Sequence, residues 1–336
     1  MATLKDVARI AEVSPSTASR ILHGGAIRVS SETRARVERV ARDMAYRANN
    51  SARSLRTRVT RTLGILLSDS QNPVYAQMIV GANEAAAEHG YSLLMMSARD
   101  DARRAAFLEM VAEDRADGLI LADAGLDCSW VEKLRFTGAP FVLVNHPGPE
   151  GSASVMMDDA RGAAMAIAHL IEQGHREIAY LSAPLSTDVG RRRLAATREV
   201  LGRHGIALPD RRWFECGFAG EGAAAAVDRL LWHKEPITAI ATGGIVAAMV
   251  AIKALLQRGV SVPEQVSVVS FHDNPFAQYM TPGITAVRMP LEEVGRLAVV
   301  HVLDLIEGAE PRAVIVTDPP PVLVSRQSVA RREVEV

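Results

Sequence analysis

The sequence predicts an α/β protein in which a small helical head precedes a larger body of parallel sheets. Residues 1–46 show helical periodicity, with no strand-like alternation. From Arg61 onward, short apolar runs alternate with Ala-rich helical stretches, and this alternation comes in two successive sets. Such alternation is typical of parallel sheets covered by helices on both faces, so each set suits one doubly wound domain. A length of 336 residues agrees with several domains.

Charge is divided unequally between the head and the body. Through Arg61 the chain holds 13 basic and 5 acidic residues, a net charge of +8. The whole chain is −1, so residues 62–336 carry −9. A basic head on an acidic body indicates a polyanion-binding module joined to a domain with another role.

The first predicted helix starts at Thr3 and Leu4, and its apolar residues recur at helical spacing. Thr3 is placed to cap this helix, and Asp6 adds negative charge to its first turn. Residues 12–14 are expected to form a turn in which Val13 fills the angle between two helices. Ser14 then caps the second helix, where Pro15 loses no hydrogen bond.

The second helix, Pro15 to Leu22, is expected to turn a polar face outward. The inward positions are Ala18, Ile21 and Leu22, and the outward positions are Pro15, Ser16, Ser19 and Arg20. Hydroxyls can meet phosphates, and arginine can fork onto guanine in the major groove. A third helix begins near Ser31, with Val37, Val40, Ala41 and Met44 on its apolar face. The alternative interpretation of this segment is a helical hairpin with a solvated basic face.

In the body, strands and helices are expected in alternation. The expected strands are Thr62–Leu67, Tyr91–Ala98, Gly118–Ala122, Phe141–Asn145, Glu177–Ser182, Trp213–Cys216, Ala239–Ala241 and Val266–Phe271. The expected helices are Tyr75–His89, Ala102–Arg115, Ala160–Gln173, Gly190–His204, Gly222–Trp232 and Val246–Arg258. A pair of such domains has a crevice at the carboxyl ends of its strands, where a small molecule binds.

Three segments of the head resemble transcription regulators of the lac-repressor type: Thr3–Leu22, Val29–Val37 and Tyr46–Leu55. The resemblance continues through the body to about Arg326. It implies a helix-turn-helix DNA-binding domain (1–46), a hinge (47–60) and a body (61–336) of periplasmic-binding-protein type. The implied N-subdomain is about 61–158 and 287–318, and the implied C-subdomain is about 159–286 and 319–330.

The resemblance also implies which residues contact DNA. Those positions are Thr3, Ser14, Pro15, Ser16, Thr17, Ser19, Arg20, His23, Asn49, Ala52, Arg53 and Leu55. Residues 49–56 would form a hinge helix with Leu55 as an apolar wedge in the minor groove, a known bending device. The alternative is that Leu55 packs the linker against the body. Three residues depart from the family pattern: Glu12 replaces a glycine of the turn, His23 an asparagine, and Ala48 a proline.

In the body, the resemblance implies an effector site lined by Tyr75, Arg193, Phe218, Gly244, Ile245 and His272. Arginine with two aromatic side chains suits a sugar or a sugar acid. Relatives usually have Asn-Asp at positions 244 and 245 and aspartate at 272, so their specificity does not transfer. An imidazole at 272 would make binding depend on pH. The alternatives are a surface histidine and a pocket that has lost its effector, and Arg191 and Arg192 could be solvated neighbours.

Several functions are disfavoured by what the sequence lacks. Cys128 and Cys216 lack metal-ligand spacing and suit a reducing compartment. The sequence shows no signal peptide, no membrane-spanning run and no catalytic constellation, so we expect neither an enzyme nor a cofactor or metal. The expectation is a cytoplasmic homodimeric repressor that binds pseudo-palindromic operator DNA and a small effector, with no membrane partner. The alternative is a periplasmic-type solute-binding protein without a regulatory role.

Overall fold

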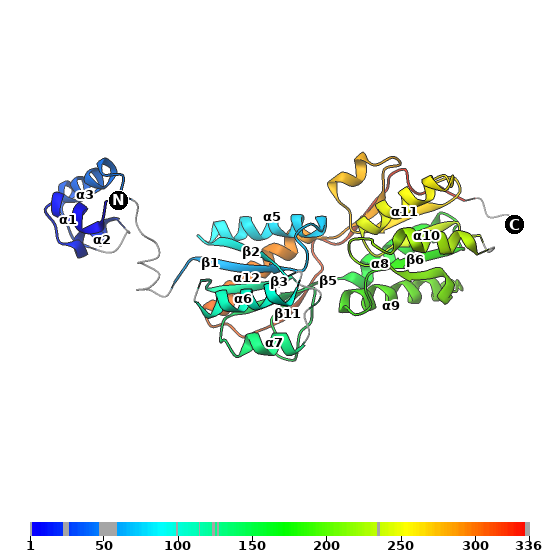
Figure 1. Ribbon diagram of the computed structural model, residues 1–336, viewed down its shortest axis with the longest axis horizontal. Coiled ribbons are helices and arrows are strands. Elements are labelled where there is room, and N and C mark those ends of the chain that lie inside the picture. Colours follow the sequence, from blue (N-terminus) through cyan, green and yellow to red (C-terminus); the bar gives the residue numbers. More distant parts are fainter. Residues whose placement is uncertain are drawn as a thin grey trace. The chain divides into compact units, whose positions relative to one another are not determined.

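The computed structural model divides the chain into two units, Met1–Thr60 and Arg61–Val336 (Figure 1). It describes residues 2–22, 27–46, 59–98, 100–113, 115–122, 125, 128–233 and 236–332.

The first unit holds three short helices around a small apolar core. They are α1 (Leu4–Ile10), α2 (Pro15–Leu22) and α3 (Ser31–Asp43). The buried core residues are Val7, Ala8, Ala11, Ala18, Ile21, Val37 and Ala41. Leu22 is only partly buried against this core, and Val13 packs on it as expected. Small alanines at these positions allow three short helices to approach closely.

Side-chain caps fix the starts of both α1 and α2. Thr3 and Asp6 form a reciprocal capping box at the start of α1. The Ser14 hydroxyl accepts from the backbone N–H of Thr17, 3.0 Å away, and so caps α2. Between the two helices, Glu12 adopts a positive φ of 52°. A side chain in this left-handed conformation is disfavoured, which explains why glycine suits this turn.

The second unit contains two six-stranded sheets. The first has the order β11-β5-β4-β3-β1-β2, and every neighbouring pair is parallel. Its strands are β1 (Thr62–Leu67), β2 (Ser92–Ser97), β3 (Gly118–Ala122), β4 (Phe141–Val144), β5 (Ser154–Met157) and β11 (Ala313–Val316). Its helices are α5 (Pro73–Glu88), α6 (Asp101–Ala112), α7 (Cys128–Arg135) and α12 (Leu291–Ile306).

The second sheet has the order β12-β10-β9-β8-β6-β7, parallel except for the antiparallel pair of β10 and β12 at one edge. Its strands are β6 (Ile178–Ser182), β7 (Trp213–Glu215), β8 (Ala239–Thr242), β9 (Ser267–Phe271), β10 (Thr285–Arg288) and β12 (Val322–Val324). Its helices are α8 (Asp159–Glu172), α9 (Asp188–Arg203), α10 (Ala223–Trp232) and α11 (Ile245–Gln257), with 3₁₀ turns η1 (Asp210–Arg212) and η2 (Pro275–Tyr279). The central strands are apolar and buried on both faces, as helix-covered parallel strands should be.

The predicted α/β class and the two parallel sheets are confirmed. Elements beyond Phe271, together with α7 and β5, are not among the predicted ones. After β10 the chain returns to the first sheet with α12 and β11, and it ends in the second sheet with β12. It therefore passes between the sheets after β5, after β10 and after β11.

Two glycines let α5 and α12 cross in close contact. A Cβ atom on Gly81 would lie 1.9 Å from the carbonyl oxygen of Glu292, and one on Gly295 would lie 1.9 Å from that of Met78. The crossing therefore fixes the position of α5, whose first turn carries Tyr75. In the described part of the chain, no helix is long and apolar enough to cross a membrane.

Candidate functional site

The head presents an exposed polar surface at the start of α2. Ser14, Pro15, Ser16 and Arg20 are exposed. The Ser14 hydroxyl lies 2.8 Å from the hydroxyls of both Ser16 and Thr17. This cluster sits at the helix N-terminus, where backbone N–H groups attract phosphate oxygens. Arg20 lies one turn further along and extends into solvent.

Ser19 does not face outward as expected, because it is only 9% exposed. The buried residues Ala18 and Ile21 lie to one side of Ser19 around the helix, so Ser19 borders the buried arc. A side chain as short as serine at the edge of this buried arc is covered by the core of the head and does not join the polar face. The polar face of α2 is therefore narrower than the sequence indicates.

Thr3 is exposed, but its hydroxyl already donates to Asp6 Oδ2 over 2.7 Å. This hydrogen bond is the largest cause of the lowered pKa of Asp6. The remaining predicted DNA contacts lie outside the described residues. They are His23, Asn49, Ala52, Arg53 and Leu55, together with the rest of the expected hinge helix.

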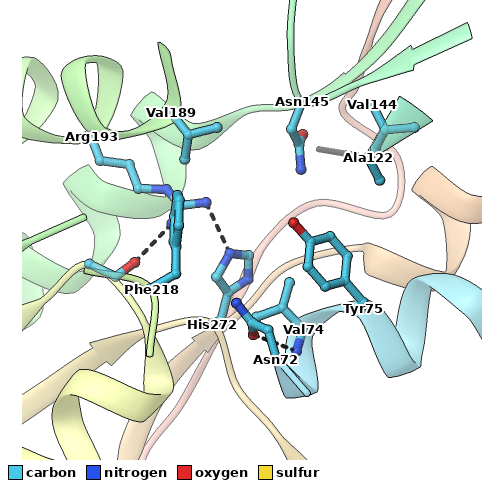
Figure 2. A pocket seen from close by; sticks show the side chains of 11 residues that line it. Asn72, Val74, Tyr75, Ala122, Val144, Asn145, Val189, Arg193, Phe218 and His272 are labelled. Atoms are coloured by element: carbon cyan, nitrogen blue, oxygen red, sulfur yellow. Dashed lines mark hydrogen bonds between the residues drawn. The ribbon is translucent and has the colours of Figure 1, made fainter. Parts of the chain in front are cut away.

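The body contains a pocket, partly open to solvent, that is lined by residues from loops of both sheets (Figure 2). Its lining residues are Asn72, Val74, Tyr75, Ala122, Val144, Asn145, Val189, Arg193, Phe218, Gly243 and His272. Most of them lie at the carboxyl ends of parallel strands or at helix starts, where ligands of doubly wound folds bind. The pocket combines apolar side chains with a few polar groups, as small-molecule sites do.

Arg193, on α9, is held on three sides by the protein itself. Its Nε donates to Asp159 Oδ1 over 2.7 Å and its Nη1 donates to the Gly243 carbonyl over 2.8 Å. Its Nη2 lies 2.9 Å from Nε2 of His272. The guanidinium also lies over the Phe271 ring, 3.8 Å from its centroid. One N–H on each Nη remains beyond these bonds, so a ligand meets a preorganised and largely occupied arginine.

Asp159, the first residue of α8, joins two arginines. Its side chain is fully buried, and its Oδ2 accepts from Nη1 of Arg192 over 2.5 Å while Oδ1 accepts from Arg193. Arg192 also donates through Nε to Asp188 Oδ2 over 2.6 Å. Two guanidinium groups and two carboxylates thus balance one another behind the pocket. The interpretation of Arg192 as a solvated neighbour is wrong, because these carboxylates draw it inward.

His272 lies at the end of β9 with a positive φ of 67° and is 3% exposed. The imidazole occupies the centre of the view in Figure 2 and receives the Arg193 hydrogen bond. Burial and then the nearby Arg193 charge hold the pKa of His272 well below its usual value. The imidazole is therefore neutral at physiological pH, and the expectation that it changes charge between pH 6 and 8 is wrong.

Opposite His272, the start of α5 contributes Asn72 and Tyr75. Asn72 caps α5, its Oδ1 accepting from the backbone N–H of Val74 over 3.1 Å. The Tyr75 hydroxyl bonds that of Ser68. Figure 2 shows this hydroxyl and the Asn145 amide pointing into the same space. Asn145 Oδ1 accepts from the backbone N–H of Met157 over 3.0 Å.

Two predicted lining positions differ from the structure. The glycine that lines the pocket is Gly243 rather than Gly244, which begins α11 as its N-cap. Ile245 is 2% exposed and belongs to the core of the second sheet. The helix starts at Ile245, so its side chain turns toward the sheet and away from the pocket.

Sequence reasoning identified four lining residues, Tyr75, Arg193, Phe218 and His272, and missed several others. Asn145 directly follows β4 and Asn72 directly precedes Pro73 at a helix start, and both are positions that sequence alone indicates. Val189 lies one helical turn before Arg193 and shares its face of α9. Asp159 carries no local signal, because its partners are 33 and 34 residues away in the chain.

Two known families match parts of the chain. Residues 3–49 match the family described as "Bacterial regulatory proteins, lacI family". Residues 167–329 match the family described as "Periplasmic binding protein-like domain". The two matches cover the head and most of the second half of the body.

Individual relatives match nearly the whole chain. The ribose operon repressor of Escherichia coli (strain K12) is 32% identical over 302 residues, covering 89% of this chain and 91% of that protein. The HTH-type transcriptional repressor PurR of Edwardsiella ictaluri (strain 93-146) is 31% identical over 335 residues, covering 98% and 97%. The structure of transcriptional regulator CelR with cellobiose has a TM-score of 0.75 at 28% identity, covering 98% of this chain and all of that one. The lac repressor dimer bound to operator and the anti-inducer ONPF has a TM-score of 0.87 at 24% identity, covering 98% and 99%, which is a likeness of fold.

Proposed function

Since the chain belongs to the lacI family of bacterial regulatory proteins, we propose that it is a repressor whose affinity for operator DNA depends on a small metabolite bound in the Arg193 pocket. The observation that carries this proposal is the joint presence of two sites in one chain. One is the exposed hydroxyl and arginine face of α2. The other is the pocket between polar and aromatic residues of the body.

The α2 face supports operator binding. The capped N-terminus at Ser14 and Pro15 suits a phosphate, and Arg20 is free to reach a base edge. The exposed basic residues in the described part of the head are Lys5, Arg9, Arg20, Arg28, Arg39 and Arg42. A charge of +8 through Arg61 favours binding to phosphate-rich partners.

Exposed apolar side chains support a homodimer, which would bind a pseudo-palindromic operator. Val80 on α5 is 46% exposed, and Met95 on the edge strand β2 is 51% exposed. The helix α5 contacts β2, which is the edge strand of the first sheet. Apolar surface of this kind often marks an interface.

The pocket supports regulation by a sugar or sugar acid. Phe218 and Tyr75 offer aromatic surface, and Arg193, Asn72 and Asn145 offer hydrogen-bond donors. Binding between loops of both sheets favours one relative position of the subdomains, and that preference is the link to operator affinity. A solute-binding protein without regulatory role would not need the α1–α3 head.

The DNA-binding half is tested by selecting a preferred sequence from random duplexes and measuring affinity against salt. We expect log affinity to fall linearly with log salt, with a slope of about −0.9 per phosphate contact. The control variant is Arg296→Ala, which removes an arginine from the body instead of the head and should leave DNA affinity unchanged. Arg296 lies on α12 and pairs with Glu293. A salt-independent affinity would remove nucleic acid as the partner.

The effector half is tested by thermal shift of the whole chain against sugars, sugar acids and nucleobases. A ligand at 100 times its dissociation constant stabilises the folded state by about 2.7 kcal/mol, a shift that is easily measured. Binding must then weaken in Tyr75→Ala and persist in Arg296→Ala. A ligand that binds both variants equally occupies a different site.

A further inference from the structure

The two asparagines of the pocket have fixed orientations. Asn72 Oδ1 accepts from the backbone N–H of Val74, and Asn145 Oδ1 accepts from the backbone N–H of Met157. A backbone N–H can only donate, so the oxygen of each amide is the atom turned toward the protein. Both NH₂ groups are left for the pocket, and neither has a hydrogen-bond partner among the described residues.

The Arg193 contact fixes the proton of His272 in the same way. A guanidinium can only donate, so Nε2 of His272 is the acceptor of the 2.9 Å bond from Arg193 Nη2. A neutral imidazole then carries its hydrogen on Nδ1. This Nδ1 is buried and has no partner among the described residues. In Figure 2 it lies on the side of the ring that faces Asn72, Val74 and Tyr75.

The polar side chains around the centre of the pocket are therefore mainly donors. The Asn72 and Asn145 amides, the His272 imidazole and the remaining Arg193 N–H groups all offer hydrogens. A buried N–H that meets no acceptor costs about 1–3 kcal/mol, so the pocket selects against a ligand that leaves Nδ1 unpaired.

We propose that the effector presents to His272 an acceptor atom that carries no hydrogen, namely a carbonyl or carboxylate oxygen, an inference that rests on the effector role proposed above. Lactones and nucleobases with a carbonyl group, such as uracil, supply such an oxygen without charge, and sugar acids supply it with charge. Charge alone does not choose between them, because Asp159 and Asp188 already balance Arg192 and Arg193. The common requirement is the unprotonated oxygen.

The test compares ligands that share a skeleton and differ in this one group. Five- and six-carbon aldoses are matched with their 1,4-lactones and their aldonates, and uracil represents the nucleobases that carry a carbonyl oxygen. Thermal shift selects the binders, and titration calorimetry measures their dissociation constants. The lactone and aldonate arms separate the neutral source of the oxygen from the charged one.

Two variants of His272 isolate the role of Nδ1. An asparagine Nδ2 can occupy the place of Nδ1 and still donates, whereas an aspartate oxygen there only accepts. Both residues adopt positive φ more readily than most, so both variants are compatible with the 67° backbone. We expect His272→Asn to keep the ligand and His272→Asp to lose roughly 5- to 150-fold in affinity for it. His272→Asp should in turn gain affinity for the parent aldose.

Histidine ¹⁵N correlation spectra provide a readout that needs no ligand. The His272 signal, identified by its loss in His272→Asn, should show a hydrogen on Nδ1 and none on Nε2. A hydrogen on Nε2, an aldose that binds as tightly as its lactone and aldonate, or equal affinities of the Asn and Asp variants would each overturn the inference while leaving an effector pocket in place. Failure of every probe to bind the wild type would instead remove the effector role itself, and the inference with it.

Discussion

Asp159→Asn should destabilise the body more than any other single carboxylate change near the pocket. The Asp159 side chain is fully buried and accepts from Arg192 at 2.5 Å and from Arg193 at 2.7 Å. Asparagine keeps one acceptor oxygen and turns an NH₂ group toward the second arginine. Arg193, whose side chain is 3% exposed, then keeps a buried charge with no counter-ion.

The expected loss follows from these contacts. Breaking a buried ion pair by removing one partner costs about 3–5 kcal/mol, because the remaining charge is left in a medium that solvates it poorly. Asp188→Asn is the matched control, since Asp188 pairs with the same Arg192 but its side chain is 23% exposed. Partial solvation limits the cost of that change to about 1 kcal/mol or less.

Urea unfolding followed by tryptophan fluorescence measures both variants. The three tryptophans, Trp130, Trp213 and Trp232, all lie in the body, so the signal does not include the head. Equal m-values would show that the change in midpoint is a change in stability. If Asp159→Asn loses no more than Asp188→Asn, the buried pair does not hold the pocket together.

Three further predictions follow from other parts of the structure. Arg20→Ala should cost about 1–3 kcal/mol of binding free energy at the preferred DNA sequence and relax base choice at one position per half-site. Affinities for a set of single-base variants of that sequence measure both effects. An equal loss of affinity for all sequences would mean that Arg20 contacts only phosphate. Gly295→Ala should cost about 1–3 kcal/mol in urea unfolding, because its new Cβ would overlap the Met78 carbonyl, whereas Gly202→Ala, with open space at that position, should not destabilise the body. The folded-state pKa of His272 is well below its unfolded value near 6.5, so as the pH falls the unfolded chain binds the proton before the folded chain does. The free energy of unfolding of the body should therefore decrease as the pH falls below about 6.5, by up to roughly 1.4 kcal/mol per pH unit. His272→Asn should lessen that loss. Effector affinity should stay constant from pH 6 to 8, where His272 stays neutral, and calorimetry that shows a tenfold change over this range would contradict the assignment.

Sequence reasoning succeeded where an element is determined by local residues. The predicted strand Gly118–Ala122 is a continuous apolar run and matches β3. The Thr3 and Ser14 caps are also local, since each bonds a residue three positions away. The strands after Phe271 have only three or four residues each and are separated by prolines, so their pattern is too short to read. Helix α12 does show helical spacing of apolar residues, from Leu291 to Val302, and this signal could have identified it.

The sequence allowed a prediction of which loops form the pocket. It did not allow a prediction of how the charges of the pocket residues are balanced. The pattern of strands predicted a crevice, the family resemblance implied Tyr75, Arg193 and His272 as part of its lining, and all three line the pocket. It gave no indication that Asp159 neutralises Arg193 or that burial keeps His272 uncharged, because both depend on packing between distant segments. The outward position expected for Ser19 failed for a similar reason: a core surface, and not helical periodicity alone, determines which residues at the edge of a face are covered.

The passage of the chain between the two sheets imposes an order on biosynthesis. The first sheet contains β5, which ends at Met157, and β11, which begins at Ala313. At a ribosomal rate of about 5–20 residues per second, roughly 8 to 30 s separate the emergence of these two neighbouring strands. For most of that interval α5 lacks its partner α12, and throughout it the edge of β5 that will pair with β11 is unpaired. The second sheet is nearly complete once β10 has been synthesised, because β12 is its one later strand. The nascent first subdomain is therefore the part of this protein most exposed to chaperones and to wrong strand pairing, although it is made before the second.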